Sequence, residues 1–78
     1  MTAVKDQSKK ALVLGGGGFI GNHLVRRLKT EGFWVRSVDL EPPSYAASEA
    51  DDFIVGDLRE SVVMRDAVKG GFSEVYQL

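Results

Sequence analysis

Cysteine is absent from this sequence, and histidine occurs once, at His23. Without cysteine the chain can form neither a disulfide nor a thiolate metal site, and a single histidine cannot build a metal cluster. An excess of either charge is also absent, because 10 basic and 11 acidic side chains give a formal net charge of −1. The charges are interspersed, which argues against a nucleic acid or an anionic membrane as a partner.

Long apolar runs are missing too. No stretch reaches the roughly 18 uninterrupted apolar residues of a membrane-spanning helix. The first ten residues, MTAVKDQSKK, are polar and lack the apolar centre of a secretory signal. We therefore expect a cytoplasmic protein in which residues 1–9 are a disordered lead-in to the first ordered element.

Glycine, by contrast, is concentrated at one place, since five of the nine glycines lie in VLGGGGFIGNH, residues 13–23. The apolar run KALVL (10–14) precedes them and is typical of a short buried strand. The segment FIGNHLVRRLKTEG (19–32) follows and carries one apolar helical stripe: Ile20, Leu24, Val25 and Leu28. A glycine-rich turn between a strand and a helix predicts phosphate binding, because backbone N–H groups at the helix start can approach an anion. The alternative interpretation is a flexible connector.

The rest of the chain continues the alternation of strands and helices. Further strands are predicted at 33–40, 53–58 and 74–78, and a second helix within 60–71. The order β-α-β-β-α-β predicts an α/β fold, the first half of a Rossmann-type doubly wound parallel sheet. Two helices cannot cover both faces of four parallel strands. We therefore expect residues 10–78 to be the N-terminal part of a dinucleotide-binding domain, truncated before the catalytic and substrate-binding region, and not a complete small protein.

Two registers of the glycine motif fit the sequence. G-x-G-x-x-G matches Gly16, Gly18 and Gly21, whereas G-x-x-G-x-x-G matches Gly15, Gly18 and Gly21. Spacing alone does not choose between them. A Walker A loop is disfavoured, because Asn22 follows the last glycine where that loop requires a lysine.

Four quoted segments resemble one known family. GGGGFIGNHLVRRL, VDL, GDLRE and VYQL are similar to the extended short-chain dehydrogenase/reductases, the NAD-dependent nucleotide-sugar epimerases and dehydratases, and within them to the GDP-mannose 3,5-epimerase branch. The chain departs from the usual pattern at Leu14, where the family has Thr, and at Gln77, where many members have His or Asn. The resemblance selects the second register and implies that NAD is the cofactor. The residues it assigns to cofactor binding are Gly15, Gly18, Phe19, Ile20, Gly21, Asp39, Leu40, Asp57 and Leu58.

Asp39 is the acidic residue expected at the ribose. It ends the second predicted strand, 18 positions after Gly21, close to the spacing at which a carboxylate meets the adenosine hydroxyls. No arginine follows it directly, since Leu40 and Glu41 come next, so NAD is favoured over NADP. The alternative is an ordinary carboxylate at a strand end.

Asp57 follows the third predicted strand, and two interpretations remain open for it. The resemblance places its carboxylate near the adenine amino group, with the backbone of Leu58 beside the ring. The spacing of Asp57 and Glu60 also fits a capping box at the start of the second helix.

No catalytic group is predicted within the chain. The family uses a tyrosine with a lysine four residues later, but Tyr45 is followed at that distance by Glu49 and Tyr76 lies two residues from the end. His23 is expected to be a solvated surface residue, and Trp34 and Tyr76 to pack. We expect the NAD-binding segment of an enzyme that transfers a hydride transiently to and from tightly bound NAD. Its nucleotide-sugar substrate would bind to the missing C-terminal part of a homodimeric parent. The alternative is a non-catalytic dinucleotide-binding sensor or scaffold.

Overall fold

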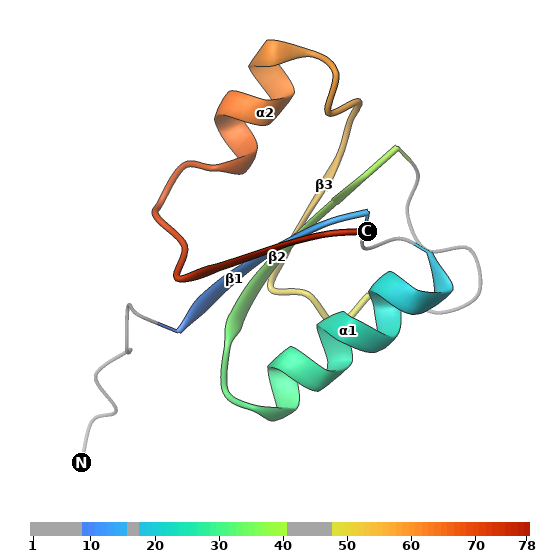
Figure 1. Cartoon of the computed structure of the whole chain (residues 1–78), viewed down its shortest axis with the longest axis vertical. Coiled ribbons are helices and arrows are strands. Elements are labelled where there is room, and N and C mark those ends of the chain that lie inside the picture. The colour runs from blue at the N-terminus through green and yellow to red at the C-terminus, as the bar shows by residue number, and fades with distance from the viewer. Residues whose placement is uncertain (1–8, 16–17, 41–47) are drawn as a thin grey trace.

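The computed structural model describes residues 9–15, 18–40 and 48–78. The predictions for residues 1–8, for the glycine register that begins at Gly16, and for Tyr45 rest on residues outside these ranges. Six elements follow one another along the chain (Figure 1): β1 Lys10–Leu14, α1 Phe19–Thr30, β2 Trp34–Asp39, β3 Asp52–Val55, α2 Ser61–Ala67 and β4 Glu74–Gln77.

The four strands form one parallel sheet in the order β3-β2-β1-β4. β1 lies inside the sheet, with Leu14 opposite Val38 of β2 on one side and Gln77 of β4 on the other. Ala11 and Val13 face one side of β1, and Leu12 faces the other, and all three are fully buried. An apolar run without alternation is what a strand buried on both faces requires. The predicted fold class, the first half of a Rossmann-like α/β sheet, is confirmed.

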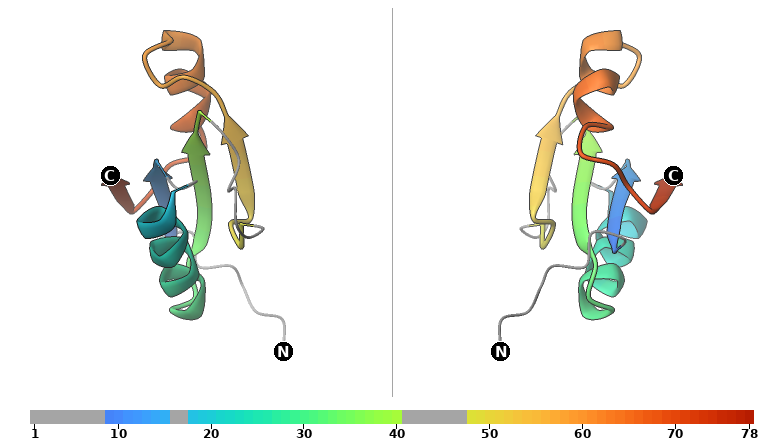
Figure 2. Two further views of the ribbon diagram at one scale, coloured as in Figure 1. Left: turned by 90° about the vertical axis from the view of Figure 1, so that its right-hand side faces the viewer. Right: turned by 90° about the vertical axis from the view of Figure 1, so that its left-hand side faces the viewer.

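The two helices pack on opposite faces of the sheet, over its central strands β1 and β2, and each interface has its own apolar core (Figures 1 and 2). Val55 of β3 and Val75 of β4 stay exposed, in line with the expectation that two helices cannot cover four strands. The core under α1 comprises Ala11, Val13, Val25, Leu28 and Val35, and the core under α2 comprises Leu12, Leu14, Val38 and Ala67. Tyr76 packs against the α1 core, as predicted, and its hydroxyl donates a hydrogen bond to Glu74.

The buried face of α1 differs from the predicted stripe. Ile20 is 71% exposed, whereas Asn22, expected on the polar face, is only 6% exposed. The buried residues of α1 are Gly21, Asn22, Val25 and Leu28. Gly21 is buried and Ile20 is exposed, so the buried face of the helix begins at residue 21 and not at residue 20. The helix ends as predicted, because Gly32 adopts a φ of 92° directly after the C-cap residue Glu31.

Trp34 packs at the amino ends of the strands, as predicted. Its ring centroid lies 6.3 Å from that of Phe72, and the guanidinium of Arg36 lies 5.4 Å from the Trp34 centroid. The same guanidinium donates hydrogen bonds to the carbonyl oxygens of Ala67 and Lys69 at the end of α2, at 2.9 and 2.7 Å. A cation satisfies carbonyl groups that the helix leaves unpaired, and this contact attaches α2 to β2.

Asp51 attaches the segment before β3 to α1 and β2. Its carboxylate accepts hydrogen bonds from Lys29 Nζ at 2.8 and 3.0 Å and from the backbone N–H of Val35 at 2.7 Å. Burial disfavours the charged form of Asp51, but the contacts with Lys29 and Val35 outweigh burial and lower its pKa below the ordinary value of 3.8. The folded structure therefore stabilises the ionised form of Asp51 relative to its protonated form.

We expect Asp51→Ala to lower the free energy of unfolding by about 1 to 2 kcal/mol, because it removes a partly buried ion pair and a hydrogen bond to the backbone. Urea denaturation of the full-length protein at neutral pH measures this change. The difference in free energy of unfolding between the variant and the unsubstituted protein should have its full size above pH 3.8, the ordinary pKa of Asp51. It should vanish as the pH falls through the lower pKa of the folded state.

Glu49→Ala serves as the matched control, because Glu49 forms an ion pair with Arg26 in which both side chains are 54% exposed. Its expected effect is below about 0.5 kcal/mol at any pH. Equal losses for the two variants would contradict the role assigned to Asp51.

Candidate functional site

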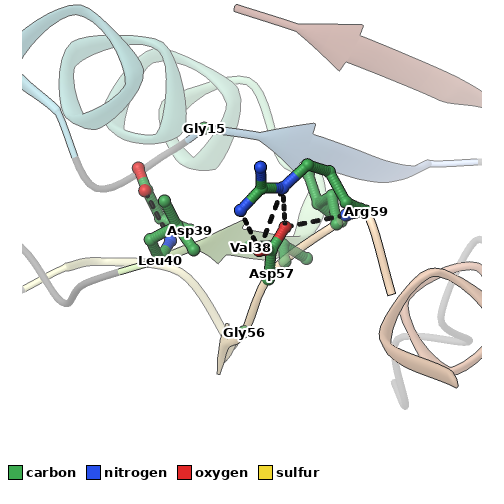
Figure 3. A pocket seen from close by; sticks show the side chains of 8 residues that line it. Gly15, Val38, Asp39, Leu40, Gly56, Asp57 and Arg59 are labelled. Carbon is green, nitrogen blue, oxygen red and sulfur yellow. Dashed lines mark hydrogen bonds and ion pairs between the residues drawn. The ribbon is translucent and has the colours of Figure 1, made fainter. Parts of the chain in front are cut away.

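A hollow of about 290 Å³ opens at the carboxyl ends of the strands (Figure 3). Its lining comes from the segments that follow three neighbouring strands: Gly15 after β1, Val38, Asp39 and Leu40 at the end of β2, and Gly56, Asp57, Leu58 and Arg59 after β3. Ligands of open α/β sheets bind at this edge. The volume is near the lower end of the range of about 300 to 1,000 Å³ typical of small-molecule pockets, enough for one part of a larger ligand.

Gly15 forms the turn that leaves β1. Its φ of 95° lies in a region that residues with a side chain rarely adopt. Its N–H donates a 2.6 Å hydrogen bond to the carbonyl oxygen of Val38, so the ends of β1 and β2 are joined directly. The neighbouring N–H of Leu78 donates to the carbonyl oxygen of Leu14 at 3.0 Å. The positive φ, and not these bonds, is what favours glycine at residue 15, where the second glycine register begins.

The first turn of α1 has the features of an anion-binding helix start. Gly18 is the N-cap, no side chain caps the helix, and its first turn contains no acidic residue. The first helical hydrogen bond to Gly18 comes from the N–H of Asn22, at 2.9 Å, so the N–H groups before it have no acceptor within the helix. A Cβ added at Gly18 would meet no described atom within 4 Å, which leaves open space beside the backbone for a ligand.

The predicted site residues fall into two groups in the structure. Five of them line the hollow together: Gly15, Asp39, Leu40, Asp57 and Leu58. Gly18, Phe19, Ile20 and Gly21 lie on the first turn of α1 and do not line it. The side chains of Phe19 and Ile20 are exposed but apolar, so the hydrogen-bond donors that Gly18 to Gly21 can offer a pyrophosphate are backbone N–H groups. His23 is exposed, as predicted, and its ring lies edge-on to that of Phe19 with centroids 4.6 Å apart.

Asp39 lies at the edge of the hollow, where β2 ends. Its Oδ1 accepts a hydrogen bond from the N–H of Leu40 at 2.6 Å, and its carbonyl oxygen accepts one from the N–H of Gly56 at 2.9 Å. The second bond joins the end of β2 to the turn after β3, which carries Asp57. The two aspartates predicted to meet one nucleotide therefore line one hollow.

Asp57 does not cap α2. The N-cap residue of that helix is Glu60, and no side chain caps it, so the capping-box interpretation is wrong. The third predicted strand also ends earlier than residue 58, because β3 stops at Val55 and residues 56–58 form a turn toward the hollow. The carboxylate of Asp57 instead accepts hydrogen bonds from Arg59, two residues later.

Arg59 lines the hollow but was not among the predicted site residues. Its side chain and its backbone N–H both contact the Asp57 carboxylate, and these contacts lower the pKa of Asp57 from 3.8 to about 2. The sequence carried a signal for it, since an Asp-x-Arg spacing in a turn allows an ion pair. Gly56 was missed as well. A Cβ there would lie 3.0 Å from a methyl group of Val63, so glycine lets α2 approach the turn.

Other kinds of site have no support in the described ranges. No group of three or more histidine, cysteine, aspartate or glutamate side chains among them could hold a metal ion. None of the helices in the part of the chain that the structure describes is long and apolar enough to cross a membrane.

A glycine turn after β1, a helix start without a side-chain cap and two carboxylates at the strand ends are the features of the first half of a Rossmann-like fold. The model of the NAD dependent epimerase/dehydratase family matches residues 11–78, and the chain belongs to this family. The resemblance drawn from the glycine motif and the strand ends is thereby confirmed.

Two relatives illustrate the range of the family. The chain is 39% identical over 61 residues to a 3 beta-hydroxysteroid dehydrogenase/Delta 5-->4-isomerase of Mycobacterium tuberculosis, an alignment covering 78% of this chain and 16% of the relative. It is 34% identical over 77 residues to a GDP-mannose 3,5-epimerase of Arabidopsis thaliana, covering 94% of this chain and 20% of the relative. The chain thus spans a fifth or less of the length of these relatives.

The two glycines at the ends of the turn should respond differently to alanine. Gly15→Ala is expected to lower the free energy of unfolding by about 1 to 3 kcal/mol, because alanine is strained at a positive φ. Gly18→Ala should lower it less, by at most about 1 kcal/mol, because Gly18 has a φ of −83° and open space beside it, and only the poorer N-cap preference of alanine counts against the change. Urea denaturation of both variants of the full-length protein measures these values.

Gly18→Ala should nevertheless weaken dinucleotide binding by about 10-fold or more, because the added Cβ occupies the space through which a pyrophosphate approaches the backbone. Isothermal titration with NAD measures this effect in the full-length protein. Unchanged affinity in a normally stable Gly18→Ala variant would show that the ligand does not approach this turn.

Proposed function

We propose that this chain is the NAD-binding segment of a nucleotide-sugar epimerase or dehydratase. The observation that carries the proposal is the meeting of Gly15, Asp39 and Asp57 in one hollow at the carboxyl ends of three neighbouring strands. Family membership supports it, and so does the similarity to the Arabidopsis GDP-mannose 3,5-epimerase over nearly the whole chain.

In this proposal, different residues of the chain contact different parts of the NAD molecule. Backbone N–H groups at the start of α1 bind the pyrophosphate, since they carry the positive end of the helix dipole. The Asp39 carboxylate accepts hydrogen bonds from the ribose hydroxyls, and Asp57 lies at the adenine with the backbone of Leu58. When bound, NAD supplies the chemistry by taking up a hydride from the substrate and returning it.

The charges of the hollow favour NAD over NADP. Asp39 and Asp57 are both acidic, and the cation Arg59 is engaged by Asp57 at 2.7 Å, so it only partly offsets their charge. A phosphate on the 2′-oxygen would approach Asp39 and be repelled. Neither Leu40 nor Glu41 supplies the arginine that accommodates such a phosphate in NADP-binding relatives of this fold.

The reacting groups would come from the rest of the parent protein. The sequence contains no tyrosine with a lysine four residues later, so the general base of the family's chemistry lies outside these 78 residues. The nucleotide-sugar site, a homodimeric assembly and a cytoplasmic location belong to the same proposal.

A second candidate is oxidation of a hydroxysteroid. The observation that favours it is the 39% identity to the Mycobacterium tuberculosis dehydrogenase, higher than the identity to the epimerase although over a shorter segment. Both candidates need the same NAD-binding segment and differ in the substrate pocket, which this chain does not form.

Two measurements test the proposal. Denaturing the full-length protein and identifying the released cofactor should yield NAD, and recovery of only NADP or a flavin would contradict it. The protein should then convert a nucleotide sugar, with transient nicotinamide reduction on mixing. Turnover of hydroxysteroids alone favours the second candidate. Tight NAD binding without reduction by either substrate class favours the non-catalytic sensor or scaffold.

Asp39→Asn is expected to weaken NAD binding by about 10-fold, because an amide accepts hydrogen bonds from the ribose less strongly than a carboxylate does. It should also raise affinity for NADP relative to NAD, because the repulsive charge is removed. Isothermal titration with both dinucleotides measures the two effects. Asp66→Asn is the matched control, because Asp66 lies on α2 outside the hollow and pairs with Lys69 on the surface.

A further inference from the structure

A second polar cluster lies toward the amino ends of the strands, at the edge of the sheet opposite the hollow. Its centre is the guanidinium of Arg36, whose side chain is only 15% exposed. Nε donates to Asp52 Oδ2 at 2.8 Å, and Nη1 donates to the carbonyl oxygens of Ala67 and Lys69 at 2.9 and 2.7 Å. One partly buried cation therefore connects three elements: β2, on which it lies, the start of β3, and the end of α2.

Two aromatic rings restrict the orientation of this guanidinium. Its carbon lies 5.4 Å from the ring centroid of Trp34 and 5.2 Å from that of Phe72, distances at which a ring attracts a cation. Lys10 Nζ lies 5.2 and 5.4 Å from the same two centroids, and it donates to the carbonyl oxygen of Gly70 at 2.9 Å. A planar fork held against two rings has little freedom, so its hydrogen bonds determine where the end of α2 lies.

The start of α2 is coupled to the turn that lines the hollow. No side chain caps the helix at Glu60. Its first turn instead packs closely on the preceding segment, because a Cβ at Gly56 would lie 3.0 Å from a methyl group of Val63. The N–H of Glu60 donates to the carbonyl oxygen of Asp57 at 2.9 Å, so the turn that carries Asp57 is hydrogen-bonded to the start of the helix.

α2 connects the two edges of the sheet, because it runs from the carboxyl end of β3 back to the amino end of the parallel strand β4. Its seven residues span about 10 Å, and the hydrogen bonds along its backbone make them move as one unit. Releasing the end of the helix therefore also shifts its start. The shift reaches the hollow through the three lining residues next to the helix: Asp57, Leu58 and Arg59.

We propose that Arg36 is a positioning residue for NAD binding: by holding the end of α2, it sets the place of the turn at residues 56–59 and hence of Asp57 in the hollow. Arg36 itself does not line the hollow. The inference rests on the proposed NAD-binding function and extends it to a residue at the opposite edge of the sheet.

The test is a double-mutant cycle on the affinity of the full-length protein for adenosine diphosphate, measured by competition against NAD. Arg36→Met removes the guanidinium but keeps an apolar side chain, Asp57→Asn removes the charge of the carboxylate, and a third variant combines both changes. A second cycle pairs Arg36→Met with Gly18→Ala, because Gly18 is the N-cap of α1 on the other face of the sheet.

Arg36→Met should weaken binding of ADP by about 5- to 10-fold, because a turn that is no longer held in place presents Asp57 poorly to the ligand. In the Asp57→Asn background the same substitution should change the affinity by less than about 2-fold, since the contact through which it acts is already altered. In the Gly18→Ala background the full factor should remain, since Arg36 and Gly18 share no contact partner.

Two further variants complete the design. Arg36→Lys should retain part of the affinity for ADP, because lysine keeps the charge but loses the planar fork. Arg65→Met is the matched control and should bind ADP as the unsubstituted protein does, because Arg65 is an exposed arginine on α2 that does not line the hollow.

The possible failures are distinguishable. If neither NAD nor ADP binds to the unsubstituted protein, the proposed function fails. If both bind, but Arg36→Met leaves the affinity unchanged or weakens it by the same factor in the Asp57→Asn and Gly18→Ala backgrounds, the function stands and positioning by Arg36 is overturned. If Arg36→Met does not fold, both cycles are run with Arg36→Lys and judged by the same criteria.

Discussion

The burial of β1 on both faces is the constraint on which the rest of the structure depends. A strand with neighbours on both sides and a helix over each face has no exposed surface, so every residue from Ala11 to Leu14 is apolar and buried. Because β2 and β4 both run parallel to β1, the carboxyl ends of the strands meet at one edge. The chain must turn sharply there to begin α1, and Gly15 makes the turn with a positive φ.

The site follows from this edge. The hydrogen bond from Gly15 to Val38 joins the ends of β1 and β2, and the bond from Gly56 to Asp39 joins the ends of β2 and β3. Each of these two hydrogen bonds holds the segment that follows one strand beside the segment that follows the neighbouring strand. These backbone hydrogen bonds place Asp39 and Asp57 around one hollow, although Asp57 itself lies outside the strands. The geometry of the site is a consequence of the parallel pairing.

The sequence predicted those features that depend on local pattern. The strand at 10–14, the glycine turn, the end of α1 at Gly32 and the parallel α/β class all follow from composition and spacing within a few residues. Val25 and Leu28 of α1 are buried as predicted, but the first turn buries Gly21 in place of Ile20, because the rotation of a helix is set by how it packs on the sheet. Arg59 was missed because its ion pair depends on the turn after β3, and the shape of a turn is not encoded in apolar periodicity.

Asp57 contributes to the candidate site and not to the stability of α2. Three residues before Glu60, an aspartate could have capped α2, a contact typically contributing about 1 kcal/mol. Instead α2 begins without a side-chain cap, and Asp57 lies in the hollow with its carboxylate held by Arg59. Because that contact lowers the Asp57 pKa to about 2, the carboxylate stays ionised throughout the neutral and mildly acidic range. A short helix without a cap beside an oriented, ionised carboxylate is the arrangement expected where local sequence rules yield to the needs of a ligand.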